Sequence, residues 1–448
     1  MLDILGYVED LYGKKILENS CGEGNFLTEI VARYINDCKR KGFSSKKICD
    51  GLERDIYGFE FDEATYEKCI YNLNIVLKKY SLPSVNWNVH QEDALKVMHE
   101  QIYSFVVGNP PYISYSALPV DDREHIKESY AVCKDGKPDY YYAFIESAIK
   151  CLDEDGKLVY LVPNNFFKTK FAQKLRDYVR HTLLEIHDYT SNKIFDKFLT
   201  SSAIIVCDKS GYSAEVQYSD IANNKKMIIQ KDKMVGRWIF EEAVSSNSNK
   251  SRFSDSFSVS SVVATLYNNA FIIKPESNEY SQVESEILRI AASPKCLAKS
   301  KVEYIIFPYY YDSGGVLKRY SEDNFITKFP KAVKHLRKFS DDLEQRNSDK
   351  TAAWFEYGRT QALAHLNQRK LLLSTVVTSR VRIYELDEQT IPYAGFYIIA
   401  KPGYSLTEAK KILESNDFLS YVRKVGVHTS GESIRISIQD INDFHYHK

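Results

Sequence analysis

The residues best suited to chemistry form the segment Asn109-Pro110-Pro111-Tyr112, which directly follows an apolar run at 104–108. The run favours a β-strand, and the two prolines must end it, because proline neither continues a helix nor donates to a sheet ladder. Such a corner holds carbonyl groups and a ring rigidly at the carboxyl edge of a sheet, where open α/β folds bind ligands. The segment therefore predicts a binding site, although an ordinary turn after a strand would explain these four residues equally well.

A second candidate site is the loop Glu18-Asn19-Ser20-Cys21-Gly22-Glu23-Gly24-Asn25-Phe26, which follows a strand predicted at 14–17 and precedes a helical pattern. Gly22 and Gly24 allow the backbone to turn tightly and to approach a ligand closely. The loop lacks the third glycine of a dinucleotide site and the lysine of a nucleoside-triphosphate site, and its acidic residues would repel phosphate. It therefore indicates a ligand that is not strongly anionic, with a plain turn as the alternative.

Two further acidic residues follow predicted strands. Glu60 lies at the end of a strand predicted within 56–62, where a carboxylate is placed to hold ribose hydroxyls. A solvated acid that opens a helix is the simpler alternative. Asp93 follows a strand predicted at 85–89, and it would accept a hydrogen bond from an adenine amine or cap a helix.

Strands and helices alternate from residue 14 to about residue 210, which is the pattern of a parallel, doubly wound α/β sheet. A serine-rich stretch at 245–261 indicates a boundary loop, and beyond it short strands and helices are mixed. The sequence therefore predicts a Rossmann-like α/β domain at 1–243 and a mixed α+β domain at 244–448.

The composition excludes several classes of protein. Lys+Arg 60 and Asp+Glu 60 cancel, so any surface that binds nucleic acid must be local. The Cys 8 are scattered without a C-x-x-C pair, which predicts neither a metal site nor a disulfide framework and favours a reducing cytoplasm. There is no leader pattern and no apolar run near the ~20 residues that a membrane span needs. We therefore expect a cytoplasmic protein without a membrane partner.

Together these features resemble the amino-methyltransferases that act on DNA, specifically the adenine (N6) enzymes of restriction–modification systems with the gamma order of motifs. In that order the cofactor loop precedes the proline corner, and the target-recognition domain comes last. Asn-Pro-Pro-Tyr after an apolar strand is the specific element, and the resemblance covers residues 13 to about 210 motif by motif. It implies an S-adenosylmethionine-dependent catalytic domain at 1–243 and a DNA-binding target-recognition domain at 244–448.

The resemblance implies a set of cofactor contacts. Glu18 would face the methionine end of S-adenosylmethionine, Glu60 the ribose and Asp93 the adenine. Two aromatic residues would enclose the adenine ring, with a core position as the alternative for both, and smaller residues would complete the site. These residues are Phe61, Phe144, Ser20, Gly22, Gly24, Ala94 and Pro111. Asn19 and Ser20 depart from the usual Pro and Ala. Either residues 2–12 supply the family's upstream segment alone or the chain begins inside a longer reading frame, which bears on cofactor affinity.

The resemblance also implies how the target base is held. An adenine amine is a poor nucleophile because its lone pair is delocalised into the ring. The Asn109 side-chain oxygen and the Pro110 carbonyl would accept hydrogen bonds from its two N–H groups. The lone pair would then be available for in-line attack on the sulfonium methyl. The base must leave the duplex, and Tyr112 would stack on it. Phe195 would lie beside the base, with Phe198 as its rival and a core position as the alternative for both.

The second half carries the expected DNA contacts. Lys331, Lys334 and Lys338 share one face of a predicted helix and would contact phosphates, although a basic run is more often a solvated face. Arg359 and Gln361 lie in a segment that resembles the family's recognition domains, and they have the forks that suit guanine and adenine edges. The expected partner is double-stranded DNA. Because no acidic-lysine nuclease pattern is evident, a cognate restriction endonuclease would be a separate chain.

Two other functions fit parts of this pattern. Protein glutamine methyltransferases also use Asn-Pro-Pro-Tyr, to bind a planar amide, but the long second half argues against this function. A noncatalytic DNA-binding specificity protein would keep a methyltransferase-like fold, and the intact Asn109, Tyr112, Glu60 and Asp93 argue against it.

Overall fold

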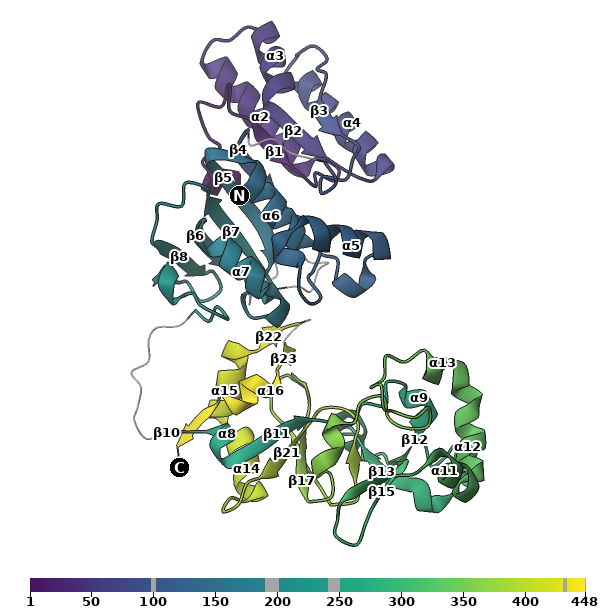
Figure 1. The fold of residues 1–448 in the computed structure, drawn as a ribbon. Helices are drawn as coiled ribbons and strands as arrows, with labels where there is room; N and C mark the ends of the chain where they lie inside the picture. Colours follow the sequence, from purple (N-terminus) through teal and green to yellow (C-terminus); the bar gives the residue numbers. More distant parts are fainter. Residues whose placement is uncertain (98–101, 190–200, 241–249, 430–432, 448) are drawn as a thin grey trace. The chain divides into compact units, whose positions relative to one another are not determined.

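The computed structural model describes residues 1–97, 102–189, 201–240, 250–429 and 433–447. The chain divides into two compact units (Figure 1). The first unit comprises Met1–Glu242 and His428–Gly431, and the second comprises Ala243–Val427 and Glu432–Lys448. The division lies next to the boundary expected from the sequence, and each unit has hydrophobic core clusters of its own.

A nine-stranded sheet forms the first unit, in the order β3-β2-β1-β4-β5-β7-β6-β8-β9. The strands, in chain order, are β1 (Ile16–Glu18), β2 (Ile56–Phe59), β3 (Asn88–His90), β4 (Tyr103–Gly108), β5 (Leu152–Pro163), β6 (Leu183–Asp188), β7 (Ser202–Asp208), β8 (Glu215–Asp220) and β9 (Lys225–Gln230). The first five strands are parallel, whereas β7 runs antiparallel to both β5 and β6. The Rossmann-like α/β class is confirmed, but the sheet is mixed rather than wholly parallel.

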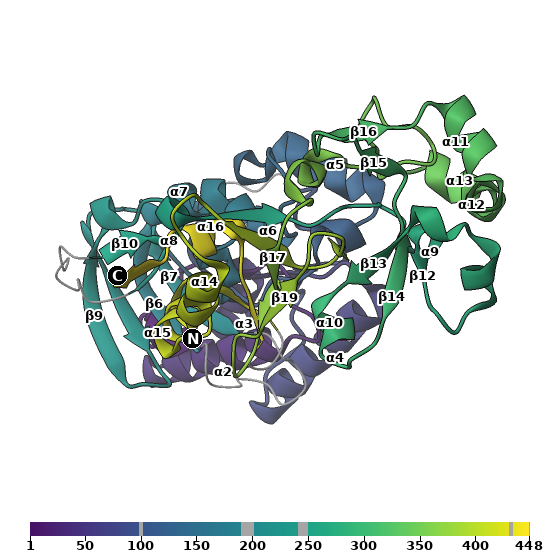
Figure 2. The ribbon, with the colours of Figure 1, turned by 90° about the horizontal axis from the view of Figure 1, so that it is seen from below.

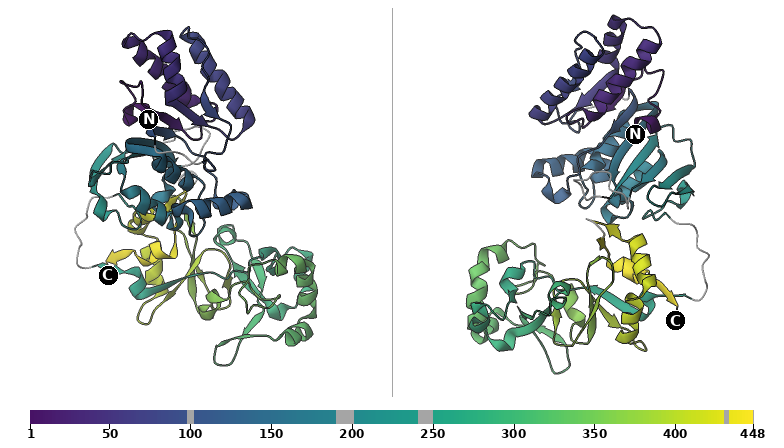
Figure 3. Two further views of the ribbon diagram at one scale, coloured as in Figure 1. Left: turned by 45° about the horizontal axis from the view of Figure 1, so that its top comes forward. Right: turned by 180° about the vertical axis from the view of Figure 1, so that it is seen from behind.

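Helices cover both faces of this sheet (Figure 3). They are α1 (Leu2–Leu5), α2 (Asn25–Arg40), α3 (Ser45–Asp55), α4 (Glu63–Lys79), α5 (Val120–Ser129), α6 (Tyr141–Cys151) and α7 (Gln173–Arg180). Successive residues of β4 enter opposite cores: Val106 packs with residues of α6 and α7, while Phe105 and Val107 pack with residues of α2 and α4. This is why the run reads as continuously apolar, since a strand that is buried on both faces has no polar side.

The direction of winding reverses between β1 and β4. The chain leaves β1, crosses to β2 and β3 on one side, and returns through β4 on the other side of β1. Ligands of open α/β sheets bind outside the carboxyl ends of the strands at such a switch point. Glu18 and Gly108, the last residues of β1 and β4, therefore mark the place where a ligand is expected.

The second unit consists of small sheets and short helices (Figure 2). One sheet has the order β11 (Phe257–Ser261), β21 (Phe396–Ala400), β17 (Lys370–Leu373), β19 (Ile383–Leu386), and another β12 (Ile272–Ile273), β14 (Glu303–Ile306), β13 (Leu288–Ala292), β20 (Ile391–Pro392). The shorter pairings are β10 (Lys250–Arg252) with β24 (His445–His447), β15 (Tyr309–Tyr311) with β16 (Leu317–Arg319), and β18 (Val376–Val377) with β23 (Ile434–Arg435), which also pairs with β22 (Val427–His428). The mixed α+β character expected from the sequence is confirmed.

The helices of the second unit are short. They are α8 (Phe253–Ser256), α9 (Asn268–Phe271), α10 (Pro294–Leu297), α11 (Glu322–Lys328), α12 (Pro330–Leu336), α13 (Ser340–Glu344), α14 (Leu406–Leu413), α15 (Asn416–Val425) and α16 (Ile438–Asn442). Two main core clusters divide this unit, one around α11 and α12 and one around α14 and α15. Across the described ranges of both units, no helix is long and apolar enough to cross a membrane.

One buried arginine holds the segment that follows β5. Arg176 of α7 is 1% exposed, and its guanidinium donates to the carbonyls of Phe166 (2.6 Å), Thr169 (2.8 Å) and Gly236 (2.7 Å). All three acceptors are neutral backbone oxygens, two from the segment directly after β5 and one from the segment after β9. The side chain therefore fixes the backbone beside the carboxyl end of β5.

We expect Arg176→Met to lower the free energy of unfolding by about 3 kcal/mol, because it leaves several buried carbonyls without donors. Arg180→Met is the matched control, since Arg180 makes a single 3.3 Å bond to the Met234 carbonyl and should change stability by under about 1 kcal/mol. Denaturant unfolding followed by tryptophan fluorescence measures both variants. Equal losses in the two variants would contradict this role of Arg176.

Candidate active site

The proline corner lies where the sequence predicted it, directly after β4. Asn109 is exposed, Pro110 is buried, and Pro111 and Tyr112 are partly buried. The Asn109 carbonyl accepts a 3.4 Å bond from the Ser20 hydroxyl, which brings the corner and the loop after β1 together. A Cβ on Gly108 would lie in ordinary contact with the Tyr160 ring at 3.4 Å and with Glu18 Cγ at 3.8 Å, so the end of β4 lies close to the end of β1. The structure thus joins the two segments that the sequence singled out separately.

Tyr112 is held from two directions. Its hydroxyl donates to the Leu161 carbonyl at 2.9 Å, and its ring meets Tyr141 at 6.0 Å between centroids with 73° between the planes. Tyr141 is itself fixed by a 2.9 Å bond to Asn165 Oδ1. Burial raises the pKa of the Tyr112 hydroxyl above its usual range, so it remains a donor. The ring is therefore preorganised and partly accessible rather than freely projecting.

Glu18 is a buried carboxylate at the end of β1. It is 2% exposed, and its Oε2 has no hydrogen-bond partner among the described residues. Burial raises the pKa of Glu18 well above its usual range, with the Cys69 thiol adding to the rise. An acceptor that is buried without a donor is unfavourable by itself, so this position suits a ligand that brings a positively charged donor.

The loop after β1 is shaped by two left-handed glycines. Gly22 has φ +54° with open space where a Cβ would stand, and Gly24 has φ +81° and begins α2 as its N-cap. The Gly22 N–H donates to Glu60 Oε2 at 2.9 Å, and the Cys21 N–H donates to the Phe59 carbonyl at 2.9 Å. The loop therefore runs along the carboxyl end of β2 and presents its backbone there.

Glu60 and Phe61 follow β2 as expected. The Glu60 carboxylate accepts from the Gly22 and Asp62 N–H groups, both at 2.9 Å, and each oxygen keeps a second lone pair for a ligand hydroxyl. Phe61 is 73% exposed, so the core position left open for it is wrong. An exposed aromatic ring beside a carboxylate suits a flat ligand carrying hydroxyl groups.

Asp93 lies after β3 and near α6. Its Oδ1 accepts from the Leu95 N–H at 3.0 Å, its Oδ2 lies 3.5 Å from the Tyr140 hydroxyl, and Lys96 Nζ is 3.5 Å away. Ala94 is buried, and Phe144 is 4% exposed and packs edge-on against Tyr140 at 5.4 Å. Asp93 therefore shapes its own turn and lies beside an aromatic pair, while Phe144 occupies the core position that was its alternative.

The structure also brings in residues that the sequence did not single out for this site. Asn19 and Tyr160 form a buried pair in which the Tyr160 hydroxyl donates to Asn19 Oδ1. The Asn19 Nδ2 has no partner in the described part of the chain. Tyr160 lies inside the apolar strand β5, where no local pattern marks it. Tyr141 contacts the Tyr112 ring and is itself bonded to Asn165. In the sequence, the only sign of this support is the pair Asn164-Asn165 directly after β5.

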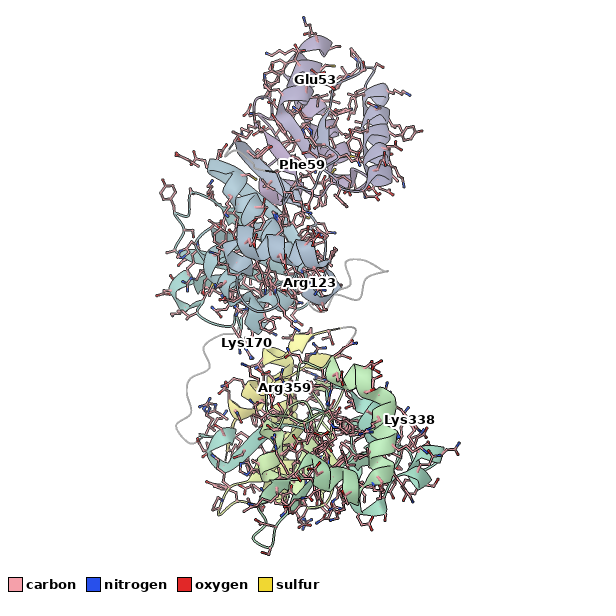
Figure 4. All side chains as sticks on the ribbon, turned by 45° about the vertical axis from the view of Figure 1, so that its right-hand side comes forward. Glu53, Phe59, Arg123, Lys170, Lys338 and Arg359 are labelled. Carbon is pink, nitrogen blue, oxygen red and sulfur yellow. The ribbon has the colours of Figure 1, made fainter. Side chains whose placement is uncertain are left out.

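The expected DNA contacts have mixed outcomes. Lys331, Lys334 and Lys338 are all exposed on α12 and the turn after it (Figure 4). Arg359 pairs with Asp349 at 2.7 Å, so its guanidinium is already engaged, while Gln361 is exposed. Phe195 and Phe198 lie outside the described residues. The three lysines have no ion-pair partner among the described residues, and Arg359, whose side chain is 42% exposed, keeps guanidinium donors beyond the one that Asp349 engages.

We expect Gly24→Ala to destabilise the first unit more than Gly22→Ala. Both positions have positive φ, which costs a residue with a Cβ about 1 kcal/mol. At Gly24 the new Cβ would also lie 2.7 Å from Cys69 Sγ, whereas at Gly22 it meets nothing within 4 Å. The additional loss should be about 1–2 kcal/mol and should shrink in a Cys69→Ala background. Equal thermal midpoints for the two single variants would contradict this steric account.

Comparison with known proteins gives the relatives of the chain. Residues 36–195 match the model of the Eco57I restriction-modification methylase family. The chain is 22% identical to the type II methyltransferase M.BstVI of Geobacillus stearothermophilus over 98% of its own length and 86% of that protein. It is also 22% identical to the type II restriction enzyme and methyltransferase RM.Eco57I of Escherichia coli, covering 91% of this chain and 51% of that one.

The fold is shared with a solved relative. The type IIL restriction-modification enzyme MmeI in complex with DNA superposes with a TM-score of 0.64 at 14% identity, over 97% of this chain and 62% of that one. The chain thus spans most of one relative and about half to two thirds of the other two. The chain is thus similar to type II methyltransferases, and its residues 36–195 match the Eco57I restriction-modification methylase family.

Proposed function

We propose that the chain is a site-specific DNA methyltransferase that moves a methyl group from S-adenosylmethionine to the N6 amine of an adenine flipped out of duplex DNA. The observation that carries the proposal is the exposed Asn109 at the end of β4, bonded through its carbonyl to the loop after β1. The names of the relatives support methyl transfer within a restriction–modification system. The corner supports an amine as the acceptor, because it offers hydrogen-bond acceptors rather than a base.

The residues at the switch point fit S-adenosylmethionine. Its methionine ammonium would supply the donor that the buried Glu18 Oε2 lacks, and its ribose hydroxyls would use the remaining lone pairs of Glu60. The open space at Gly22 and the exposed Phe61 ring leave room beside them. When bound, this cofactor supplies an electrophilic methyl group on a sulfonium.

The chain's own task is to position and polarise the amine. Asn109 Oδ1 and the Pro110 carbonyl would each accept a hydrogen bond from one of the two amine N–H groups. These bonds would draw the nitrogen lone pair out of conjugation with the ring. Tyr112 would support the base from its fixed position, and base–aromatic stacking is worth ~1–3 kcal/mol. No strong base is needed, because positioning and charge placement lower the barrier.

The central test is methyl transfer with an Asn109→Ala variant. Tritiated methyl transfer from S-adenosylmethionine to duplex DNA should fall in kcat by about 10²–10³, since a positioned polar contact to the reacting group is lost. Asn223→Ala, in the exposed β8–β9 turn, is the matched control and should keep full activity. Nucleoside analysis of the product should show N6-methyladenine. Label on protein instead of DNA would favour a glutamine methyltransferase, and no label on either would favour a noncatalytic specificity protein.

The proposal assigns DNA cleavage to a separate endonuclease chain. One relative combines restriction enzyme and methyltransferase in its printed name, and this chain spans 51% of it. Nicking of plasmid DNA by the purified chain with magnesium would contradict this assignment.

Glu18→Gln should separate cofactor binding from stability. The raised pKa means that the folded state binds the Glu18 proton more tightly than the unfolded state does. The stability contributed by this group is therefore full at acidic pH and is lost as pH rises through the folded pKa. Without ligand, the variant should match or exceed the thermal midpoint of the wild type at pH 8 and lose this pH dependence.

In the same variant, the rise in midpoint caused by saturating S-adenosylmethionine should largely disappear, because the ammonium loses its charged partner. Thermal shift at pH 5 and pH 8 with and without cofactor measures both effects. A wild-type-like ligand shift in Glu18→Gln would place the methionine end elsewhere.

A further inference from the structure

A basic pocket lies in the second unit, away from the residues that the sequence assigned to DNA. It is lined by residues of the loop between β17 and β19 and by the first turn of α10, including Ser374, Thr378, Ser379, Arg380, Arg382 and Tyr384. Figure 2 shows β17, β19 and α10 together. Neither arginine has an ion-pair partner among the described residues.

The loop is held rigidly from beneath. Val377, Val381 and Ile383 are 2%, 7% and 6% exposed and belong to one core cluster. Thr378, Ser379 and Arg380 are exposed between the first two of these anchors. Arg382 is exposed between the last two, so Arg380 and Arg382 take alternate positions that face outward. The pocket therefore presents two guanidinium groups from a preorganised backbone.

Further positive charge surrounds the pocket. Arg435 stands directly opposite Val376 in the β18–β23 ladder, and it is exposed without an ion-pair partner in the described ranges. Pro294 and Ala298 line the pocket, and their neighbours Lys295 and Lys299 are exposed.

The nearest acid along the chain does not neutralise this charge. Glu385 is the next residue after the pocket-lining Tyr384, but it pairs with Lys410 at 3.0 Å. The region around the pocket is thus strongly cationic although the whole chain has a net charge of +0.

We propose that this pocket binds duplex DNA and reads sequence, with Arg380 and Arg382 directed at guanine edges and Lys295 and Lys299 at phosphates. This inference rests on the proposed action on duplex DNA. An arginine fork matches the O6 and N7 acceptors of guanine, and a rigid loop can hold that fork in register. The exposed hydroxyls of Thr378 and Ser379 add donors and acceptors beside the forks. Arg359, the arginine expected from the sequence, shares its charge with Asp349, whereas Arg380 and Arg382 have no ion-pair partner among the described residues.

The first experiment measures binding alone, without cofactor, by fluorescence anisotropy of the full chain on a duplex that is selected from a random-sequence pool by its binding to the wild type. Arg380→Ala and Arg382→Ala should each weaken binding about 5- to 100-fold, the range of a lost base contact. Arg369→Ala is the matched control, because Arg369 has the same charge, directly precedes β17 outside the pocket lining and makes an exposed 3.8 Å pair with Glu385. It should change affinity by less than about twofold. Thermal midpoints establish that all three variants are folded.

The second experiment sequences methylated sites in cells that express each variant. The proposal expects the recognised sequence to relax at one or two guanine positions in Arg380→Ala or Arg382→Ala and to stay unchanged in Arg369→Ala. Lys295→Ala and Lys299→Ala should keep the sequence and reduce the salt dependence of binding by about one ion each.

An unchanged set of methylated sequences in both arginine variants would overturn the reading role, even if affinity fell uniformly. Unchanged affinity would overturn the pocket as a DNA site. Absence of methyl transfer by the wild type would instead refute the proposed function, and the binding experiment would still test the pocket.

Discussion

The parallel pairing of β1 with β4 is the contact on which the site depends. Ile16 lies opposite Phe105 and Leu17 opposite Val106, so the two strands end together. That register places the glycine loop and the proline corner at one edge, although about ninety residues separate them, as the Ser20–Asn109 bond shows. Gly108 lies against both neighbours, since a Cβ there would stand in ordinary contact with the Tyr160 ring at 3.4 Å and with Glu18 Cγ at 3.8 Å. The helices and outer strands serve to hold these two ends in register.

The buried polar groups at the end of β1 are only partly hydrogen-bonded. Glu18 Oε2 and Asn19 Nδ2 are both buried and both lack hydrogen-bond partners among the described residues. Such groups reduce stability by themselves, at about 1–3 kcal/mol each, and they are tolerated where a ligand completes them. Tyr112 shows the opposite arrangement, since its hydroxyl and its ring are both already held. Buried polar groups around Glu18 thus lack partners in the described part of the chain, whereas Tyr112 is already fixed by its own contacts.

The second unit contains many basic residues, and they differ in whether they have partners within the unit. Many of its cations are used internally: Lys370 is fully buried and donates to three carbonyls, and Arg346 donates to the carbonyls of Thr265, Glu356 and Trp354. A basic residue in this unit therefore says little about binding until its partners are known. Among the described residues of this unit, the three lysines on α12 and the turn after it and the two arginines of the pocket beside β19 are exposed without an ion-pair partner, so they are available to an anionic partner.

The sequence by itself determined the features that depend on local physics. Two prolines had to end β4 at Gly108, glycines with positive φ had to form the loop before α2, and alternating apolar periods predicted the Rossmann-like sheet. It missed the antiparallel insertion of β7, because period alone does not encode strand direction.

Only the tertiary structure decided which side chains are buried or already bonded and which remain available to a ligand. Asn19 with Tyr160, Arg359 with Asp349 and the burial of Phe144 all depend on residues that are distant in sequence or on packing. The pocket with Arg380 and Arg382 forms only when α10 meets the loop before β19. A residue's type states which bonds it can make, but its availability depends on neighbours that the fold supplies.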